Sequence, residues 1–249
     1  MRLSDDLGFI LLVRRLLSFL LFCYHTYDMD KQTATSTPRI KVETRHLLWI
    51  GVMAPILIVV LVLIAAAVTP NYSHLYHAVS RLGISGMPHP AVLNASMIVY
   101  GLAMCVFAYA VYDKLGRNRD ARLLSISIVA HGIGVMFAGV FNDEVVSSGQ
   151  TISAEAIVHT AFAVISYAAL LVLMVVFNIM LHNTPFRKRL IWFTAVVVLV
   201  SMPLVALFIF KAGNYLGLFQ RLGYGIALFW VVVVTLKLIL FLRQLAKLT

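Results

Sequence analysis

Charged residues are scarce in this sequence, and the two signs are unequal. Only 12% of the 249 residues are Asp, Glu, Lys or Arg, with 20 basic residues against 10 acidic ones, whereas an average soluble domain carries about 25%. Hydrophobic residues make up 61% of the chain. A soluble core of this length could not bury so much apolar surface. The composition therefore excludes an ordinary soluble domain and predicts an integral membrane protein.

Cysteine is nearly absent as well. The two cysteines, Cys23 and Cys105, lie in apolar segments and have no paired spacing. A disulfide framework and a cysteine-rich zinc site are therefore excluded. The sequence also shows no internal repeat, so a fold built from duplicated halves is not predicted.

What the sequence has in abundance is long apolar stretches. A membrane-spanning helix needs about 20 predominantly apolar residues, and six stretches come close to that length, at residues 47–68, 91–112, 123–141, 158–181, 190–210 and 218–240. We therefore predict an all-α fold, an integral membrane six-helix bundle formed by residues 45–249.

Basic residues mark every second loop of this bundle. Short loops rich in Lys and Arg stay in the cytoplasm, which predicts that both termini are inside and that the first, third and fifth loops face outside. The net charge of +10 is spread over loop ends and does not form one stripe. This distribution indicates helix orientation at an anionic membrane surface and argues against nucleic acid as a partner.

Residues 1–44 are predicted to be a cytoplasmic leader. The apolar run at residues 8–24 contains Arg14 and Arg15, which are costly inside a span, and no small-residue cleavage site follows it. Two interpretations remain open. The run is an amphipathic helix lying on the membrane surface, or the true start is Met29 and residues 1–28 precede it.

The first outer loop is the strongest candidate for a site. Its periodicity over residues 72–83 predicts a short interfacial helix, which Pro70 could start and Gly83 could cap. One face of that helix would carry His74, His77, Ser80 and Arg81. Two histidines alone do not make a metal site, because zinc needs further ligands. The alternative is an interfacial helix that is merely wetted by water.

Two other helix ends on the same side carry polar residues. Asp143 and Glu144 close the third span, and His159 opens the fourth. Gln220 and Arg221 open the sixth span, where Arg221 is predicted to pair with a carboxylate or to bind an anionic headgroup. The alternative for each is a structural role as a helix cap or an interfacial side chain.

His131 is predicted to have a different role. It lies about 18 Å from Asp143 along the same helix, in the inner half of the membrane, so it cannot share the outer site. We expect it to be a packed core histidine with a hydrogen-bond partner.

The order of the outer motifs resembles a known family. His77-x-x-Ser80-x-Leu82-Gly83 follows the first span, Gly139-Val-Phe-Asn-Asp143 closes the third, and His159 and Gln220-Arg221 open the fourth and sixth. Over residues 45–242 this pattern resembles the bacterial and archaeal membrane family catalogued as domain of unknown function 998. Asn142 stands where that family is expected to have a proline. The resemblance implies a multi-pass protein of the bacterial or archaeal inner membrane with no settled activity.

A more distant likeness is to the alkaline ceramidases and adiponectin-type receptors, which are membrane hydrolases with a Ser, an Asp and three His around zinc. The matching residue types here are Ser80, Asp143, His77 and His159. The chain has six spans and lacks a His-x-x-x-His pair near its end, which separates it from that superfamily.

Two classes of function follow. In the first, the outer helix ends form one polar pocket that binds a lipid or small molecule, through His74, His77, Arg81, Glu144, Gln220 and Arg221. The alternative is a metal-assisted hydrolase or transferase that acts on an outer-leaflet lipid, with Ser80, Asp143 and His159 as catalytic residues. Zinc, held by His77, Asp143 and His159, would then lower the pKa of its bound water to about 7. Either way, the expected partners are membrane lipids.

Overall fold

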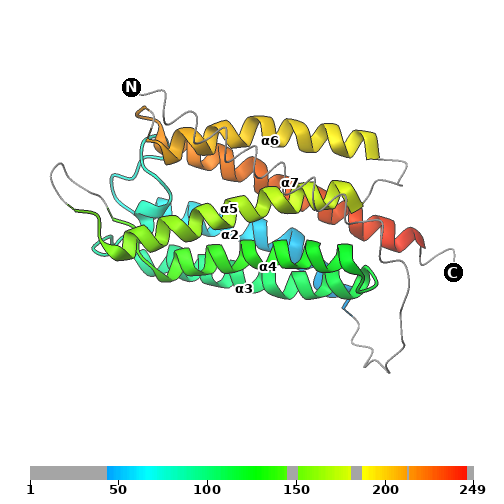
Figure 1. The fold of residues 1–249 in the computed structure, drawn as a ribbon. Helices are drawn as coiled ribbons and strands as arrows, with labels where there is room; N and C mark the ends of the chain where they lie inside the picture. The colour runs from blue at the N-terminus through cyan, green and yellow to red at the C-terminus, as the bar shows by residue number, and fades with distance from the viewer. Residues whose placement is uncertain (1–43, 145–150, 181–186, 212, 246–249) are drawn as a thin grey trace. The chain divides into compact units, whose positions relative to one another are not determined.

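The computed structural model describes residues 44–144, 151–180, 187–211 and 213–245. The described residues all belong to one compact unit, Glu43–Thr249 (Figure 1). The predicted leader, with its two alternatives, lies outside the described residues except for Thr44.

Six helices in the described part of the chain are long and apolar enough to cross a membrane, and no strand occurs there. A short 3₁₀ helix, η2 (His46–Trp49), leads into the first of them. The six are α2 (Ile50–Ala67), α3 (Pro90–Lys114), α4 (Arg119–Val140), α5 (Ala154–Met180), α6 (Arg187–Ile209) and α7 (Leu216–Leu245). The predicted all-α, six-span fold is confirmed.

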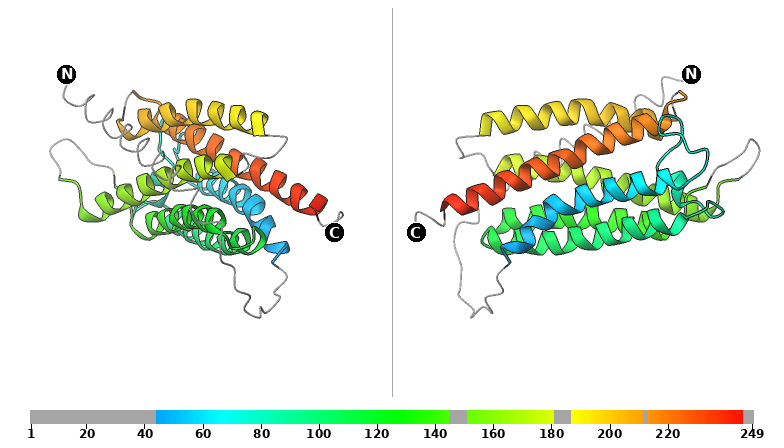
Figure 2. Two further views of the ribbon diagram at one scale, coloured as in Figure 1. Left: turned by 45° about the vertical axis from the view of Figure 1, so that its right-hand side comes forward. Right: turned by 180° about the vertical axis from the view of Figure 1, so that it is seen from behind.

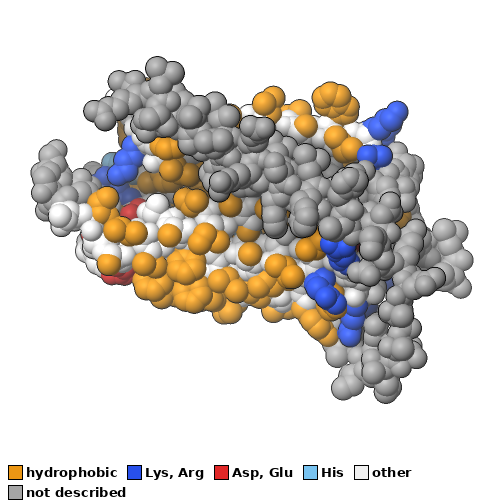
Figure 3. All heavy atoms as spheres, viewed as in Figure 1, with side chains coloured by type: hydrophobic (Ala, Val, Ile, Leu, Met, Phe, Trp, Pro, Cys, Tyr) orange, Lys and Arg blue, Asp and Glu red, His pale blue; other side chains and the backbone are white. Residues whose placement is uncertain are grey.

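Successive helices run in opposite directions, so their ends gather at two ends of the bundle (Figure 2). We call the end that carries residues 68–89, 141–153 and 210–215 the long-loop end, and the opposite one the short-loop end. Charged side chains concentrate at these two ends, and hydrophobic side chains dominate the surface between them (Figure 3). This distribution suits a helical bundle in a bilayer.

A tight turn joins α3 to α4 at the short-loop end. Gly116 and Arg117 have positive φ angles of 84° and 56°, and the Arg117 N–H donates to the carbonyl of Tyr112 at 3.1 Å. This hydrogen bond gives a donor to a carbonyl that has no partner within the last turn of the helix. The Asn118 side chain then caps α4 by accepting the N–H of Ala121 at 2.8 Å. The chain therefore reverses direction here with hydrogen bonds to backbone groups at the end of α3 and the start of α4.

The α3–α4 pair packs backbone against backbone. A Cβ atom added at Gly132 would lie 2.7 Å from the carbonyl oxygen of Gly101, and one added at Gly134 would lie 2.7 Å from the Cβ of Ser166 on α5. Small residues allow two helix backbones to approach this closely. Within lipid, the hydrophobic effect does not drive helices together, so the van der Waals contact made at such sites stabilises their association. The glycines of α4 thus join α3, α4 and α5 closely.

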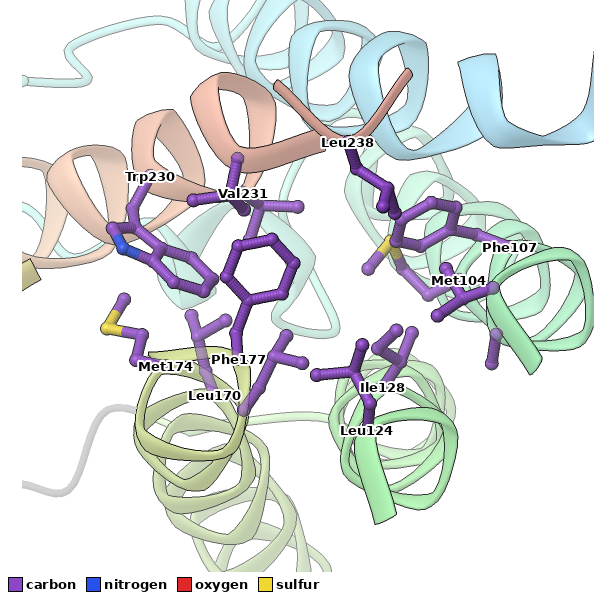
Figure 4. Packing of buried hydrophobic residues seen from close by; sticks show 14 of the residues in the cluster. Met104, Phe107, Leu124, Ile128, Leu170, Met174, Phe177, Trp230, Val231 and Leu238 are labelled. Carbon is purple, nitrogen blue, oxygen red and sulfur yellow. The ribbon is translucent and has the colours of Figure 1, made fainter. Parts of the chain in front are cut away.

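Large apolar side chains from α3, α4, α5 and α7 fill the centre of the bundle (Figure 4). Phe177 and Trp230 pack edge to face at 5.7 Å between ring centroids, an arrangement that aromatic quadrupoles favour. Met104, Leu170, Met174 and Trp230 are fully buried. This core fixes the relative positions of the four helices.

Helix α6 packs mainly on α7 and has few close approaches to α5, and in Figures 1 and 2 it lies at the edge of the bundle. Side-chain hydrogen bonds join α6 to its neighbours. Tyr167 donates to Ser201 at 3.0 Å, and Asn178 and Trp230 both donate to the Thr194 hydroxyl oxygen at 2.9 Å. We call the boundary of α6 with α5 and α7, with these bonds, the α6 seam.

His131 is a packed core histidine with hydrogen-bond partners, as predicted. Its Nε2 atom lies 2.9 Å from the Tyr100 hydroxyl, and its Nδ1 atom lies 3.0 Å from the carbonyl and the hydroxyl oxygens of Ser166. Because Tyr100 is on α3 and Ser166 is on α5, the histidine of α4 links three helices. Its role in the described chain is to pair buried polar groups.

Candidate functional site

The loop between α2 and α3 differs from its prediction. In place of one helix over residues 72–83, it has a turn at His74–Tyr76 and a 3₁₀ helix, η3 (Ser80–Gly83). The Tyr72 hydroxyl donates to the carbonyls of His77 and Ala78 at 3.1 and 2.8 Å. The Tyr72 side chain therefore occupies both carbonyls, although that of Ala78 also accepts the N–H of Arg81 at 3.3 Å. Helical periodicity could not reveal this competition.

The same loop is bound to the start of α7, about 140 residues later in the chain. The Leu218 N–H donates to the carbonyl of Leu75 at 3.0 Å, and the Val79 N–H donates to Gln220 Oε1 at 2.5 Å. The rings of Tyr76 and Tyr215 stack with centroids 5.5 Å apart. Gln220, predicted as a site residue, therefore holds the backbone of the loop.

Arg221 lies at the centre of this contact. Its Nη1 atom donates to the carbonyls of His74, His77 and Gly217 at 2.8, 3.1 and 3.0 Å. Its Nη2 atom donates to the hydroxyl of Tyr72, and the guanidinium carbon lies 5.4 Å from the centre of the Tyr72 ring. The guanidinium group thus gathers oxygens of the loop around itself.

The predicted pairing of Arg221 with a carboxylate is wrong. The ion pairs found among the described residues all involve Asp113 at the short-loop end. Backbone carbonyl groups accept the hydrogen bonds of Arg221 in place of a carboxylate. A sequence pattern does not show where the carbonyl groups of an irregular loop will lie. The Nε atom of Arg221 is enclosed and has no hydrogen-bond partner, so one donor of the group remains unused.

Gly217 makes the close contact between α7 and the loop feasible. A Cβ atom added there would lie 2.7 Å from the carbonyl oxygen of His74 and 2.8 Å from Nη1 of Arg221. Any larger residue would push the loop carbonyls away from the guanidinium group. The glycine is therefore part of the structure that positions Arg221.

Two arginines act on Tyr72 and His77 electrostatically. Burial raises the pKa of Tyr72 above its usual value, although Arg221 and Arg81 oppose the rise. Burial, and then the positive charges of Arg81 and Arg221, lower the pKa of His77. The Tyr72 ring lies 5.7 and 5.5 Å from those of His74 and His77. We call Tyr72, His74, His77, Arg81 and Arg221 the basic cluster.

Arg81 differs from Arg221 in its surroundings. It is partly exposed, and its side chain has no hydrogen bond or ion pair to any of the residues that the structure describes. Ser80, its neighbour, is buried where η3 begins. The basic cluster therefore contains one guanidinium that holds the loop and another that has no hydrogen bond or ion pair with the described residues.

A second polar network joins the other half of the loop to the ends of α3 and α4. Asn94 donates to the carbonyl of Gly83 at 3.1 Å and to Asn142 Oδ1 at 2.8 Å. The Asn142 side-chain amide donates to the Ser85 hydroxyl at 3.4 Å, and the backbone N–H of Asn142 donates to Glu155 Oε1 at 2.8 Å. This network fixes the end of α4 against the loop.

The two predicted acidic residues beside it bind local backbone groups. Asp143 Oδ1 accepts the N–H of Glu144 at 2.8 Å, and Glu144 Oε1 accepts the N–H of Ser153 at 2.5 Å. Both carboxylates are only partly buried. They shape the turn between α4 and α5 and do not reach the arginines of the basic cluster.

His159 is buried near the start of α5, with 8% of its surface exposed. Its Nδ1 atom lies 2.8 Å from the carbonyl oxygen of Ala138 and 2.9 Å from that of Phe141. Nδ1 is therefore a donor, and the other ring nitrogen is the acceptor of the neutral ring. His159 satisfies the open carbonyls at the end of α4.

The predicted site residues are divided between these two networks. His74, His77, Gln220 and Arg221 come together around Tyr72, whereas Glu144 and His159 bind backbone groups at the ends of α4 and α5. Among the described residues no three His, Cys, Asp or Glu side chains are grouped to hold a metal ion. The proposed zinc ligands His77, Asp143 and His159 are not brought together, and the hydrolase or transferase alternative stays a prediction.

The residues of these networks that were not predicted as site residues include Tyr72, Asn94 and Asn142. Tyr72 was assigned only to the apolar side of a helix, and neither Asn94 nor Asn142 was proposed as a site residue. A signal was present in the sequence, because an asparagine within an apolar span and another at a span end are costly unless they are paired.

The sequence matches the family described as "Protein of unknown function (DUF998)" over residues 52–237. A search of curated proteins and a search of solved structures found no match. The matched region extends from α2 to α7 and includes both polar networks. The chain therefore belongs to the DUF998 family of multi-pass membrane proteins, whose function is not established.

Proposed function

We propose that the long-loop end binds the anionic headgroup of a membrane lipid at the basic cluster. One observation carries this proposal. The charges of Arg81 and Arg221 both act on Tyr72 and His77, and neither arginine is paired with a carboxylate within the described part of the chain. Uncompensated positive charges attract an anion, and clustered ones increase that attraction.

The chemistry of the two guanidinium groups suits a phosphate. Arginine presents several donors in a planar fork that matches phosphate oxygens, and charge-assisted hydrogen bonds of this kind are strong. Arg221 is held in place by three carbonyls and Tyr72, so little side-chain entropy would be lost when a ligand binds near it. Arg81 would supply the direct contact.

The surroundings favour a lipid over a soluble anion. Tyr76, Tyr215 and Phe210 are exposed at this end, with 50%, 47% and 73% of their surfaces accessible. Aromatic side chains collect where membrane headgroups meet water. A ligand bound at the basic cluster would therefore be reached most easily from the headgroup layer.

The decisive experiment compares two substitutions that each remove one positive charge. In Arg81→Gln, we expect the full-length protein in neutral detergent to bind phosphatidylglycerol about tenfold more weakly, because one charge-assisted contact is lost. Lys211→Asn is the control, since Lys211 is also exposed at the long-loop end but contributes to none of the basic-cluster contacts. Equal affinity of wild type for phosphatidylglycerol and phosphatidylcholine would contradict the proposal.

The orientation of the bundle also stays a prediction, with the long-loop end outside. Its test uses single cysteines at Gly116 and at Thr151, after Cys23 and Cys105 are replaced. A membrane-impermeant thiol reagent applied to intact cells should label the cysteine at position 151 and leave the one at position 116 unlabelled. The reverse pattern would place the basic cluster at the inner leaflet.

A further inference from the structure

The neighbours of His159 determine which ring nitrogen donates. Nδ1 lies within 2.9 Å of two backbone carbonyl oxygens, and a carbonyl oxygen can only accept. Nδ1 therefore carries a hydrogen, and in this tautomer Nε2 is the acceptor. The side chain thus presents one acceptor in a fixed direction.

That acceptor has no partner within the described chain. The hydrogen bonds of His159 all use Nδ1. The fully enclosed side-chain atoms without a partner are Asn178 Oδ1 and Arg221 Nε, and Nε2 of His159 is not among them. Nε2 is therefore unpaired and open to contact from outside the bundle. A largely buried acceptor that lacks a donor is unfavourable, so a ligand that supplies one would be stabilised there.

His159 and Arg221 lie at the same level on two adjoining helices. The Tyr224 hydroxyl of α7 donates to the carbonyl of Ala163 on α5 at 3.5 Å. Arg221 lies three residues before Tyr224, and His159 lies four residues before Ala163. Each is therefore about one helical turn closer to the long-loop end than this contact. His159 and Arg221 therefore lie at a similar level along α5 and α7.

We propose that His159 Nε2 accepts a hydrogen bond from a hydroxyl group of the lipid whose phosphate is bound by the basic cluster. This inference rests on the proposed function and narrows its ligand to anionic phospholipids with a hydroxylated headgroup, such as phosphatidylglycerol. A phosphate diester carries no proton at neutral pH, so it has no hydrogen to donate to Nε2 of this tautomer. The headgroup hydroxyl supplies that donor.

The test compares two lipids of equal charge. Phosphatidylglycerol and phosphatidylmethanol both carry one negative charge, but the second has no headgroup hydroxyl. With matched acyl chains, the full-length wild-type protein in neutral detergent should bind phosphatidylglycerol roughly tenfold more tightly, as expected for one hydrogen bond to an otherwise unpaired buried acceptor. Phosphatidylcholine is the third lipid, without net charge or hydroxyl.

Two variants identify the residue. His159→Phe keeps a ring and removes the acceptor, so both anionic lipids should bind with the weaker affinity. His89→Phe is the control, because His89 is exposed at the same end, and it should keep the wild-type preference. The preference of the wild type is itself decisive if His159→Phe does not fold.

The outcomes separate this inference from the proposed function. If wild type binds both anionic lipids equally and more tightly than phosphatidylcholine, the role of His159 is overturned and the basic cluster stands. If neither anionic lipid exceeds phosphatidylcholine, both proposals are overturned. A preference for phosphatidylglycerol that survives in a folded His159→Phe protein would assign the hydroxyl contact to another residue.

Discussion

The α3–α4 pair and the α6 seam join helices in two different ways. In the pair, Gly101 and Gly132 bring two backbones together, and a single added carbon would lie within 2.7 Å of a carbonyl oxygen. At the seam, α5 and α6 are joined by hydrogen bonds between side chains, such as that between Tyr167 and Ser201. Backbone contact leaves no room for a larger residue, whereas a side-chain hydrogen bond can be lost without a clash.

The loop between α2 and α3 shares features of both regions. Gly217 of α7 lies close to its carbonyl oxygens, Arg221 donates to the carbonyls of His74 and His77, and Gln220 accepts the N–H of Val79. The difference predicts a graded set of mutational effects, in which glycine contacts are the most sensitive.

The largest effect is expected for Gly132→Leu. The new side chain would overlap the Gly101 backbone and the Cβ of Met104. Overpacking costs about 1–3 kcal/mol or more, so the Tm of the detergent-solubilised protein should fall by roughly 5–10 °C. Gly225→Leu is the control, because nothing lies within 4 Å of a Cβ at Gly225. An equal fall in both variants would remove the distinction between the two kinds of contact.

The next effect is expected for Arg221→Met. This change leaves the carbonyls of His74 and His77 without their guanidinium donor, and the loop should detach locally while the helices stay packed. Hydrogen exchange of loop amides should accelerate at least tenfold, as expected when hydrogen bonds to a charged group are lost. Arg221→Lys should restore little, since an ammonium lacks the planar fork. Unchanged exchange in Arg221→Met would show that the loop is held by other contacts.

A smaller effect is expected at the α6 seam. Tyr167→Phe and Ser201→Ala each remove the same hydrogen bond, and such bonds in membranes contribute about 0.6 kcal/mol on average. Each variant should lower the Tm by about 1–2 °C, and the double variant should be no worse than either single one. Additive losses would mean that the two side chains do not act on each other.

The smallest effect concerns pH. The pKa of His77 is lowered by partial burial and by Arg81 and Arg221, so the folded protein favours its neutral form. The resulting contribution to stability is present above the ordinary histidine pKa of about 6.5 and is lost as the pH falls below it. Between pH 7.5 and 5.5, the protection factors of loop amides, which correct for the intrinsic pH dependence of exchange, should fall slightly more in wild type than in His77→Gln. An identical pH response would contradict this assignment.

The membrane-spanning helices could be predicted from the sequence because each is a long run of apolar residues, which raises the mean hydropathy of the whole segment. The stretch predicted at 91–112 became α3, Pro90–Lys114, and the remaining five also correspond to helices. Helix ends were less predictable. Helix α5 begins at Ala154 and not near residue 158, because a hydropathy pattern assigns the charged Glu155 of its first turn to the loop.

The candidate site could be predicted only in part. The sequence indicated that Gln220 and Arg221 lie near the first outer loop, since all three are at one end of the bundle. It could not indicate that their partners are backbone groups, because those groups depend on the irregular path of the loop. Nor could it show that Asp143 and Glu144 bind local N–H groups.

The hydrogen bonds between Arg221 and the loop from α2 to α3 also have a consequence for synthesis. The carbonyl of His74 is separated from Arg221 by 147 positions, and chains emerge from the ribosome at about 5–20 residues per second. The loop must therefore wait several seconds, with five helices already made, before its last partner exists. During that interval its carbonyls are open to other donors, so a chaperone or a neighbouring subunit that binds this loop would have to leave before the sixth helix can take its place.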